Sequence, residues 1–429
     1  MFWTTLVSVL VASASSGIAL GAALGFTGLI LLHFFNYGSA YLAVDTIWGI
    51  FNSFTLSAVP MFILLGEILL RSGISERAYA AFTPIFARVP GGLLHSNVAV
   101  CTLFGAVSGS SLSTAAAIGS VAYPELSKRG YNKEAVVGSL AGAGTLGLLI
   151  PPSLSLLIFG ALTETSIGRL FAAGIVPGVM VSALFMLYIF LRSVKNPSIA
   201  PRDNTAYSLG FIVHGMLRVW PILLLILAIM GSIMFGVATP TEAAGVGVAV
   251  AIVISFIWGD LTLKGLGESV YRSALMFASI GFIVLGAAIL SQSVSILGVP
   301  QAILEAAIDS GLGKYGIFLL IVLIYVMFGC VFDGLSLMVM TLPIVFPLLT
   351  GLGFDPIWVG VMITILIEIG QVTPPVGLNL SVLTAITNGE ISLGRTAIAT
   401  IPYWGILLLA IGIITLVPSV VLILPNAIF

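Results

Sequence analysis

Long apolar runs limit what this chain can fold into more than any other feature of its sequence. Segments 171–191, 222–235 and 405–424 carry no charged residue, and a helix needs about 20 apolar residues to cross the bilayer core. Only 7% of the 429 residues are charged, whereas soluble domains carry roughly 25%. A soluble fold cannot cover so much apolar surface. We therefore predict an all-α polytopic membrane protein.

The spacing of the runs predicts nine spans, and residues 1–16 are left open as a further short one. Two other stretches, 93–124 and 314–349, each consist of two short apolar halves around a polar tip, at 108–111 and 332–334. Polar backbone at membrane depth is tolerated only inside protein or beside a wet cavity. Both stretches are therefore predicted to be re-entrant helical hairpins. The predicted spans are 17–33, 47–72, 134–163, 168–192, 211–236, 241–259, 274–295, 356–388 and 400–425.

Amphipathic connectors at 75–88 and 299–310 precede the two hairpins, and they are predicted to lie in the membrane interface. The two halves of the chain also repeat each other in order. Phe104-Gly105 resembles Phe328-Gly329, and Pro151-Pro152 resembles Pro374-Pro375, at an almost constant offset. Five predicted spans separate the hairpins, which makes the repeats inverted in topology. Inverted repeats with broken helices are typical of secondary transporters.

Charge predicts the orientation of the spans. With this span count one face holds thirteen Lys and Arg residues, and the other holds only Arg169 and Lys314. Basic residues favour the cytoplasmic side, so the first hairpin is predicted to enter from the cytoplasm. The thirteen are Arg71, Arg77, Arg88, Lys128, Arg129, Lys133, Arg192, Lys195, Arg202, Arg218, Lys264, Arg272 and Arg395.

Each Pro-Pro pair falls inside an apolar span. Proline removes a backbone donor and clashes with the preceding turn, so the helix must break there. Freed carbonyls near a hydroxyl suit a hard cation such as sodium, and the opposing half-helix N-terminus suits a carboxylate. Each hairpin tip is expected to face one break, which gives two related sites.

The predicted sodium-binding residues, for about two or more sodium ions and no organic cofactor, are Ser108, Ser111, Gly144, Gly147, Ile150, Gly329, Gly370, Thr373 and Val376. The predicted substrate-binding residues are Ser110, Ser111, Thr145, Asp333, Pro151 and Pro374.

Several acidic residues keep two interpretations open. Asp333 is either a ligand or a cap of the hairpin helix. Glu368 lies in the middle of a span, where a charge is costly and often functional, but a protonated packing residue is the alternative. Glu67 and Glu242 lie near span ends and are expected to be structural.

Other classes of function find little support in the sequence. A net charge of −1 gives no nucleic-acid footprint, and no GxxxxGK[ST], HExxH or GxSxG motif is present. A channel would show rings of like charge or a symmetric filter, whereas this chain pairs two unlike hairpins. An intramembrane enzyme would need an activated nucleophile, and Ser110 has no His or Lys near it in sequence. We therefore expect a carrier and no enzyme.

An ordered set of motifs resembles the large membrane subunit of tripartite ATP-independent periplasmic (TRAP) transporters, within the ion-transporter superfamily of elevator carriers. The resemblance implies sodium-driven uptake of an organic acid across the bacterial inner membrane. It also implies a periplasmic binding protein that delivers the solute and a small membrane subunit that braces the scaffold. The motifs are Ala58-Val59-Pro60-Met61-Phe62, Gly66-Glu67, Ser108-Gly109-Ser110-Ser111, Gly144-Thr145-Leu146-Gly147, Ile150-Pro151-Pro152-Ser153, Ala173-Gly174-Ile175-Val176-Pro177-Gly178, Thr239-Pro240-Thr241-Glu242 and Thr373-Pro374-Pro375-Val376-Gly377.

Both hairpin tips are expected to converge near the bilayer midplane, so a block that carries them must shift against a scaffold to open to both sides. The expected moving block comprises 93–163 and 314–388. Residues 1–92 are expected to form scaffold helices and the first arm, 164–313 scaffold helices and the second arm, and 389–429 a C-terminal scaffold helix.

Overall fold

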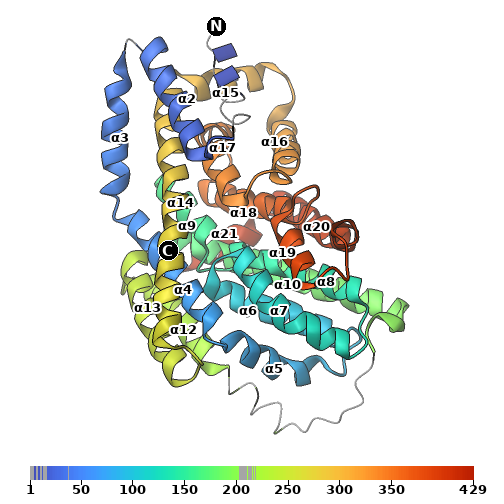
Figure 1. Ribbon diagram of the computed structural model, residues 1–429. Helices are drawn as coiled ribbons and strands as arrows, with labels where there is room; N and C mark the ends of the chain where they lie inside the picture. Colours follow the sequence, from blue (N-terminus) through green and yellow to red (C-terminus); the bar gives the residue numbers. More distant parts are fainter. Residues whose placement is uncertain are drawn as a thin grey trace.

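The computed structural model describes residues 17–36, 38–201 and 219–429, together with residues 4, 5, 8, 9, 12, 210, 215 and 217. Throughout these residues the regular structure is helical and contains no strand (Figure 1). Six of the described helices are long and apolar enough to cross a bilayer, and eight spans result if two bent helix pairs count as one span each. The predicted all-α fold is confirmed. Residues 1–16 lie largely outside the described part.

One group of helices is built on the long helix α14 (Leu263–Ile296). Helices α2 (Leu20–Phe35), α3 (Leu42–Phe51) and α4 (Ala58–Arg71) pack on α14 itself, α13 (Pro240–Ile257) packs on α4, and α12 (Trp220–Met234) packs on α13. Helix α2 touches α14 backbone to backbone, because a Cβ atom on Gly28 would lie 2.8 Å from the Ile289 carbonyl carbon. Small residues permit this approach in membrane proteins. This group is called the α14 group below.

Both predicted hairpins are helix pairs. The first joins α6 (Leu93–Ser108) to α7 (Ser111–Lys128), and the second joins α16 (Gly313–Gly329) to α17 (Gly334–Gly351). Ser110 ends the first tip as the N-cap of α7, and Asp333 ends the second tip as the N-cap of α17. The polar tips therefore lie where the sequence places them, between two helices of 16 to 18 residues.

Both Pro-Pro pairs break a helix, as predicted. Helix α8 (Lys133–Leu149) stops before Pro151-Pro152 and α9 (Leu154–Thr163) follows. Helix α18 (Pro356–Gln371) stops before Pro374-Pro375 and α19 (Leu378–Ile386) follows. Each second half-helix crosses to the opposite hairpin: Phe159 of α9 meets Phe346 of α17 edge to face, and Leu383 of α19 faces Gly119 of α7. The two breaks are thereby held against each other.

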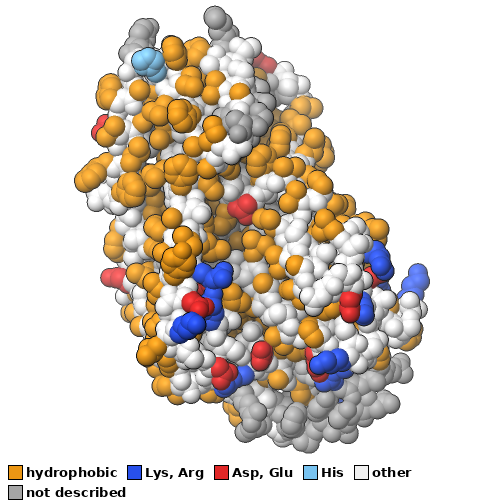
Figure 2. All heavy atoms as spheres, in the orientation of Figure 1, with side chains coloured by type: hydrophobic (Ala, Val, Ile, Leu, Met, Phe, Trp, Pro, Cys, Tyr) orange, Lys and Arg blue, Asp and Glu red, His pale blue; other side chains and the backbone are white. Residues whose placement is uncertain are grey.

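The two connectors are helices as well. Helix α5 (Ile74–Phe86) packs on α6 and α7, and α15 (Val299–Asp309) packs on α17. They lie at opposite ends of the molecule, α5 at the lower end and α15 at the upper end (Figure 1). Lys and Arg side chains gather over the lower half of the visible face, while the upper half is mostly apolar (Figure 2). This distribution fits a cytoplasmic lower end. Arg202 and Arg218 lie outside the described residues.

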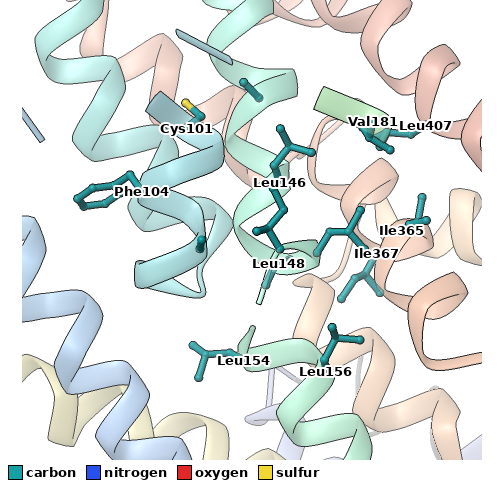
Figure 3. Packing of buried hydrophobic residues seen from close by; sticks show 14 of the residues in the cluster. Cys101, Phe104, Leu146, Leu148, Leu154, Leu156, Val181, Ile365, Ile367 and Leu407 are labelled. Atoms are coloured by element: carbon teal, nitrogen blue, oxygen red, sulfur yellow. The ribbon is translucent and has the colours of Figure 1, made fainter. Parts of the chain in front are cut away.

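Helices α10 (Ile167–Lys195), α20 (Leu393–Leu416) and α21 (Ser419–Ile428) pack mainly against the broken helices and one another. Gly142 of α8 closes on the Tyr403 ring of α20, and Gly174 of α10 closes on the Leu149 carbonyl. Val181 of α10 and Leu407 of α20 share a buried core with residues of α8 and α18 (Figure 3). The predicted domain division, which places α10 and α20 in the scaffold, stays a prediction.

Three predicted spans differ from the observed helices: one is bent, one is interrupted and one begins earlier. Residues 47–72 form two helices bent by 56°, because the Ser53 hydroxyl accepts the Leu56 N–H and starts a new turn. The span 400–425 is interrupted before Pro418, where the preceding residue cannot stay helical. Helix α14 begins at Leu263, eleven residues before the predicted 274, because Thr262 caps it and the helix continues through charged turns.

Candidate functional site

Each hairpin tip contacts the break in its own half of the chain. The Gly109 carbonyl accepts the Leu154 N–H at 3.3 Å, just past the first Pro-Pro pair. The Cys330 carbonyl accepts the Val376 N–H at 3.1 Å, just past the second. These two hydrogen bonds occupy matching places, so the tips face the breaks as expected.

A pair of glycines brings each hairpin against its broken helix. A Cβ atom on Gly105 would lie 2.7 Å from the Gly147 Cα, and one on Gly370 would lie 2.6 Å from the Gly329 Cα. Real Cβ atoms do not approach backbone so closely, so only glycine fits at these crossings. The crossings hold the tips beside the backbone that the breaks expose.

Three oxygen atoms from the first hairpin lie together beside Gly147. The Thr114 hydroxyl donates to the Ser110 carbonyl at 2.7 Å and lies 2.8 Å from the Ser108 hydroxyl oxygen. A Cβ atom on Gly147 would lie 2.8 Å from both the Ser110 carbonyl oxygen and the Thr114 hydroxyl oxygen. Neutral oxygens of this kind are the ligands that hard cations take in proteins. Thr114 was not among the residues predicted from the sequence, although it lies one helical turn after Ser110.

Other residues predicted for the first site contact neighbouring helices or the backbone of their own helix. The Thr145 hydroxyl donates to the Gly142 carbonyl of its own helix at 2.7 Å. Gly144 packs on Ala115, Ile150 packs on Gly178, and Pro151 packs on Gly174. The Leu148 carbonyl, which the break frees, accepts both the Ser153 and Ser155 hydroxyls. Part of the freed backbone is therefore satisfied by the protein itself.

The second site is more open than the first. Pro374 and Val376 are exposed, whereas Pro151 and Pro152 are buried. The Thr373 hydroxyl donates back to the Ile369 carbonyl at 2.5 Å. Asp333 caps α17, because its carboxylate accepts the Ser336 N–H and hydroxyl, each at 3.1 Å. Capping, one of the two roles left open for Asp333, is therefore present.

Both hairpin tips line one cavity of about 240 Å³ against the α14 group. The first tip contributes Ser110 and Ser111, and the second contributes Asp333. Thr145, Pro151 and Pro374 are not among the lining residues, whereas Gln371 and four α14 residues, none of them singled out in the sequence, are. The described lining is Ser110, Ser111, Leu112, Leu148, Leu154, Met276, Ser279, Ile280, Ile283, Asp333, Leu335 and Gln371.

Two buried polar side chains lie on the two halves of the second broken helix. Asn379 of α19 is fully buried, and its amide N–H donates to the Ser111 hydroxyl at 2.6 Å. Its Oδ1 atom has no partner among the described residues. Glu368 of α18 is fully buried too, and neither of its carboxylate oxygens makes a hydrogen bond within the described part of the chain. No cluster of three or more His, Cys, Asp or Glu residues that could hold a metal ion occurs among the residues that the structure describes.

The sequence and the fold of this chain are similar to those of known transport proteins. The profile of the family described as "Tripartite ATP-independent periplasmic transporter, DctM component" matches residues 6–420. A C4-dicarboxylate TRAP transporter large permease protein from Pseudomonas aeruginosa is 34% identical over 406 residues, which cover 94% of this chain and 93% of the relative. An isethionate TRAP transporter permease protein, DctMQ, from Oleidesulfovibrio alaskensis is 30% identical. The aligned region covers 86% of this chain and 58% of that relative.

A solved structure gives an independent comparison of the fold. The Alcanivorax borkumensis YdaH transporter superposes with a TM-score of 0.63 at 16% sequence identity. The match covers 89% of this chain and 90% of that one. At this identity the likeness concerns the fold alone.

Proposed function

This chain belongs to the DctM component family of tripartite ATP-independent periplasmic transporters. On this basis we propose that it takes up an organic carboxylate and that a sodium gradient drives the uptake. It is a large permease subunit, a multi-pass inner-membrane protein, and its relatives are named as permeases rather than enzymes. The observation that carries the proposal is a cavity that both hairpin tips line together with α14.

The first tip offers the better site for a carboxylate. Helix α7 begins at Ser111 directly beside the cavity, and its N-terminus carries partial positive charge. The Ser110 and Ser111 hydroxyls add hydrogen-bond donors at the same place. Helix α17 also begins at the cavity, but the Asp333 carboxylate is placed at this N-terminus, where it accepts the Ser336 N–H. We therefore assign the solute carboxylate to the first tip and leave Asp333 to face a polar or cationic part of the site.

Sodium binding is assigned to the two crossings of hairpin and broken helix. Ser108, the Ser110 carbonyl, Thr114 and Gly147 would hold one ion, and the backbone from Gly329, Gly370, Thr373 and Val376 would hold another. Bound sodium would supply the driving force for accumulation. The chain's own contribution is a set of uncharged oxygens, which bind a monovalent cation without an excess of fixed negative charge.

Transport then requires the hairpin block to move past α14, as in an elevator. Helices α4 and α14 are the main elements that meet this block from outside. The prediction from the sequence placed α10, α20 and α21 in the scaffold. Because these helices pack on the broken helices, we propose instead that they belong to the moving block with 93–163 and 314–388. Helices α5 and α15 each lead directly into a hairpin and would act as its arms.

Two partner proteins complete the proposal. A periplasmic binding protein would deliver the solute, and a small membrane subunit would brace the α14 group, as the family membership implies. The isethionate relative's name, DctMQ, and its greater length fit a chain that joins two membrane components. Relatives named for a C4-dicarboxylate and for isethionate show that the family does not fix the solute.

The test is uptake into proteoliposomes that hold this chain and its small subunit, with the binding protein and a panel of labelled organic acids outside. We expect saturable accumulation of one acid under an inward sodium gradient, and none when choline replaces sodium. Accumulation that ignores this replacement would refute sodium coupling. Liposomes with this chain alone should accumulate nothing, and robust uptake by them would refute the requirement for partners.

A further inference from the structure

The first hairpin tip presents hydrogen-bond donors to the cavity that both tips line. The Ser111 hydroxyl accepts the Asn379 amide N–H at 2.6 Å, and the Ser110 hydroxyl accepts the Ser113 N–H at 3.4 Å. Neither hydroxyl donates to another described residue, so both hydroxyl hydrogens are free for a ligand. The N-terminus of α7 lies at the same place and carries partial positive charge. This end of the cavity therefore suits a carboxylate.

The side chains at the second tip present acceptors instead. The Oδ2 atom of Asp333 accepts the Ser336 N–H and hydroxyl, and its Oδ1 atom makes no hydrogen bond within the described part of the chain. Gln371 of α18 is only 4% exposed, and its Oε1 atom has no partner among the described residues. The two side chains are neighbours, because a Cβ atom on Gly334, the residue after Asp333, would lie 2.8 Å from the Gln371 Nε2 atom. A buried acceptor without a partner is costly unless a ligand supplies the missing hydrogen bond.

The rest of the lining adds no cation at this end. Asp333 is the only charged residue among the described residues that line the cavity, and apart from Ser279 the others beyond the two tips and Gln371 are Leu, Ile or Met. A second carboxylate of a solute would lie here beside the Asp333 carboxylate, with no Lys or Arg in the lining to bind it. Like charges at close range repel. The cavity therefore has a direction, with donors at one end and acceptors at the other.

We propose that Gln371 and Asp333 bind a hydrogen-bond donor, a hydroxyl or an ammonium group, at the end of the solute opposite its carboxylate. This inference rests on the proposed uptake of an organic carboxylate through this cavity. The solute is then a hydroxy acid or an amino acid rather than a dicarboxylate. Its size is limited as well, because a cavity of about 240 Å³ has the volume of about eight water molecules at roughly 30 Å³ each. A four-carbon acid with one further polar group is of this size.

Thermal unfolding of the purified protein in detergent tests the proposal at a fixed high sodium concentration. A ligand that binds only the folded state raises the Tm, and no binding protein is present to impose its own selectivity. The probes are 4-hydroxybutyrate, 4-aminobutyrate and succinate, which are four-carbon acids that differ at the carbon farthest from the shared carboxylate. For wild type we expect the better of the first two acids to half-saturate the rise in Tm at a concentration about tenfold or more below that of succinate. That acid identifies the donor as a hydroxyl or as an ammonium group.

Two substitutions assign this preference to the second tip. Gln371→Met removes the amide and keeps an unbranched side chain, so it should raise the half-saturating concentration of the preferred acid about tenfold and leave that of succinate unchanged. Asp333→Asn keeps a residue that caps helices as well as Asp does, but it replaces one acceptor oxygen by an amide donor, so succinate should bind more nearly as well as the preferred acid. Gln301→Met is the matched control, because Gln301 is exposed on α15, and it should bind the three acids like wild type.

Several results would overturn the inference. One is succinate that binds wild type at least as tightly as the better of the other two acids, and another is a Tm that responds to none of the three. If Gln371→Met changes the binding of all three acids equally, or of none, Gln371 is a packing residue and the inference is wrong. If this variant does not fold, Asp333→Asn decides: a reduced preference over succinate supports the inference, and an unchanged one overturns it.

These results are distinct from a failure of the proposed function. Uptake of a carboxylate is decided in the proteoliposomes, where no accumulation of any acid under a sodium gradient would refute the proposed function itself. Accumulation of a dicarboxylate there would uphold that function and overturn only the assignment of a donor to Gln371 and Asp333.

Discussion

The side-chain amide of Asn379 donates a hydrogen bond of 2.6 Å to the hydroxyl of Ser111. The two residues come from different halves of the chain: Asn379 follows the second Pro-Pro break, and Ser111 begins α7 at the tip of the first hairpin. Both are buried, and Ser111 lines the cavity that the two tips share. The position of the first tip is thereby tied to the second broken helix.

Replacing Asn379 by Leu should impair uptake, because Leu keeps the number and branching of the side-chain heavy atoms but has no hydrogen-bonding group. A lost buried hydrogen bond costs about 1–3 kcal/mol, which corresponds to roughly 5- to 150-fold in solute affinity. Uptake kinetics at saturating sodium should therefore show a raised KM for the solute. The control is Asn426→Leu, which removes an exposed amide that bonds Arg169 at 3.0 Å. If the two variants show the same uptake kinetics, Asn379 does not contribute to solute binding.

Ser111→Ala and Thr373→Ala should slow uptake more than Glu242→Ala does. The first two change residues at the tips and breaks, whereas Glu242 forms a capping box with Thr239 at the start of α13. Loss of such a cap costs about 0.5–2 kcal/mol of stability, so Glu242→Ala should lower the Tm and leave the uptake rate per folded molecule unchanged. The opposite ranking of uptake at matched membrane levels would contradict the site assignment.

Thr114→Val should weaken sodium binding specifically. The substitution keeps the shape of the side chain and removes one oxygen of the cluster beside Gly147. We expect the half-saturating sodium concentration for uptake to rise about tenfold, which corresponds to about 1.4 kcal/mol. Thr102→Val is the matched control, since the Thr102 hydroxyl on the hairpin's other helix bonds the Val98 carbonyl and the Ser182 hydroxyl and takes no part in the cluster. A sodium dependence that moves equally in both variants would count against the cluster.

Gly370→Ala should prevent normal assembly of the second site. The added Cβ atom would lie 2.6–2.7 Å from the Gly329 backbone, which has no side chain that can rotate away. We expect a loss of about 1–3 kcal/mol of stability or more, as for an overpacked core, and a lowered Tm in detergent. Gly245→Ala on α13 meets nothing within 4 Å, and it should leave the Tm unchanged or raise it. A Gly370→Ala protein as stable as Gly245→Ala would show that the glycine crossing does not limit the structure.

Local signals in the sequence were enough for the hairpins and breaks. Each depends on a short stretch, such as a polar tip between apolar halves or a Pro-Pro pair inside a span, and backbone chemistry alone dictates the result. Span ends were less certain, because Thr262 and Ser53 redirect the helices through single caps and turns that hydropathy does not register.

Contacts between distant segments could not be predicted in the same way. Nothing near Asn379 in the sequence indicates that it bonds Ser111, and nothing near Ser279 indicates that it lines the cavity. The same limitation affected Thr145 and Pro151, which lie beside a predicted site in sequence yet are turned into the interior. Spacing along a helix could have identified Thr114, which follows Ser110 by one turn on the same face.

The central claim is that both tips travel past α14 with the solute. Disulfide trapping tests it with the pairs Ser110→Cys with Ser279→Cys and Leu335→Cys with Ile283→Cys, since each pair combines a tip residue and an α14 residue that line the same cavity. The background carries Cys101→Ala and Cys330→Ser. The control pair is Thr46→Cys with Gln292→Cys, whose parent side chains are hydrogen-bonded within the α14 group.

We predict that oxidation stops sodium-driven uptake for both tip pairs, that reduction restores it, and that the control pair transports in either state. If both tip pairs are fully cross-linked and still transport at least as fast as the same proteins do after the disulfides are reduced, the tips do not move past α14 and the account is wrong.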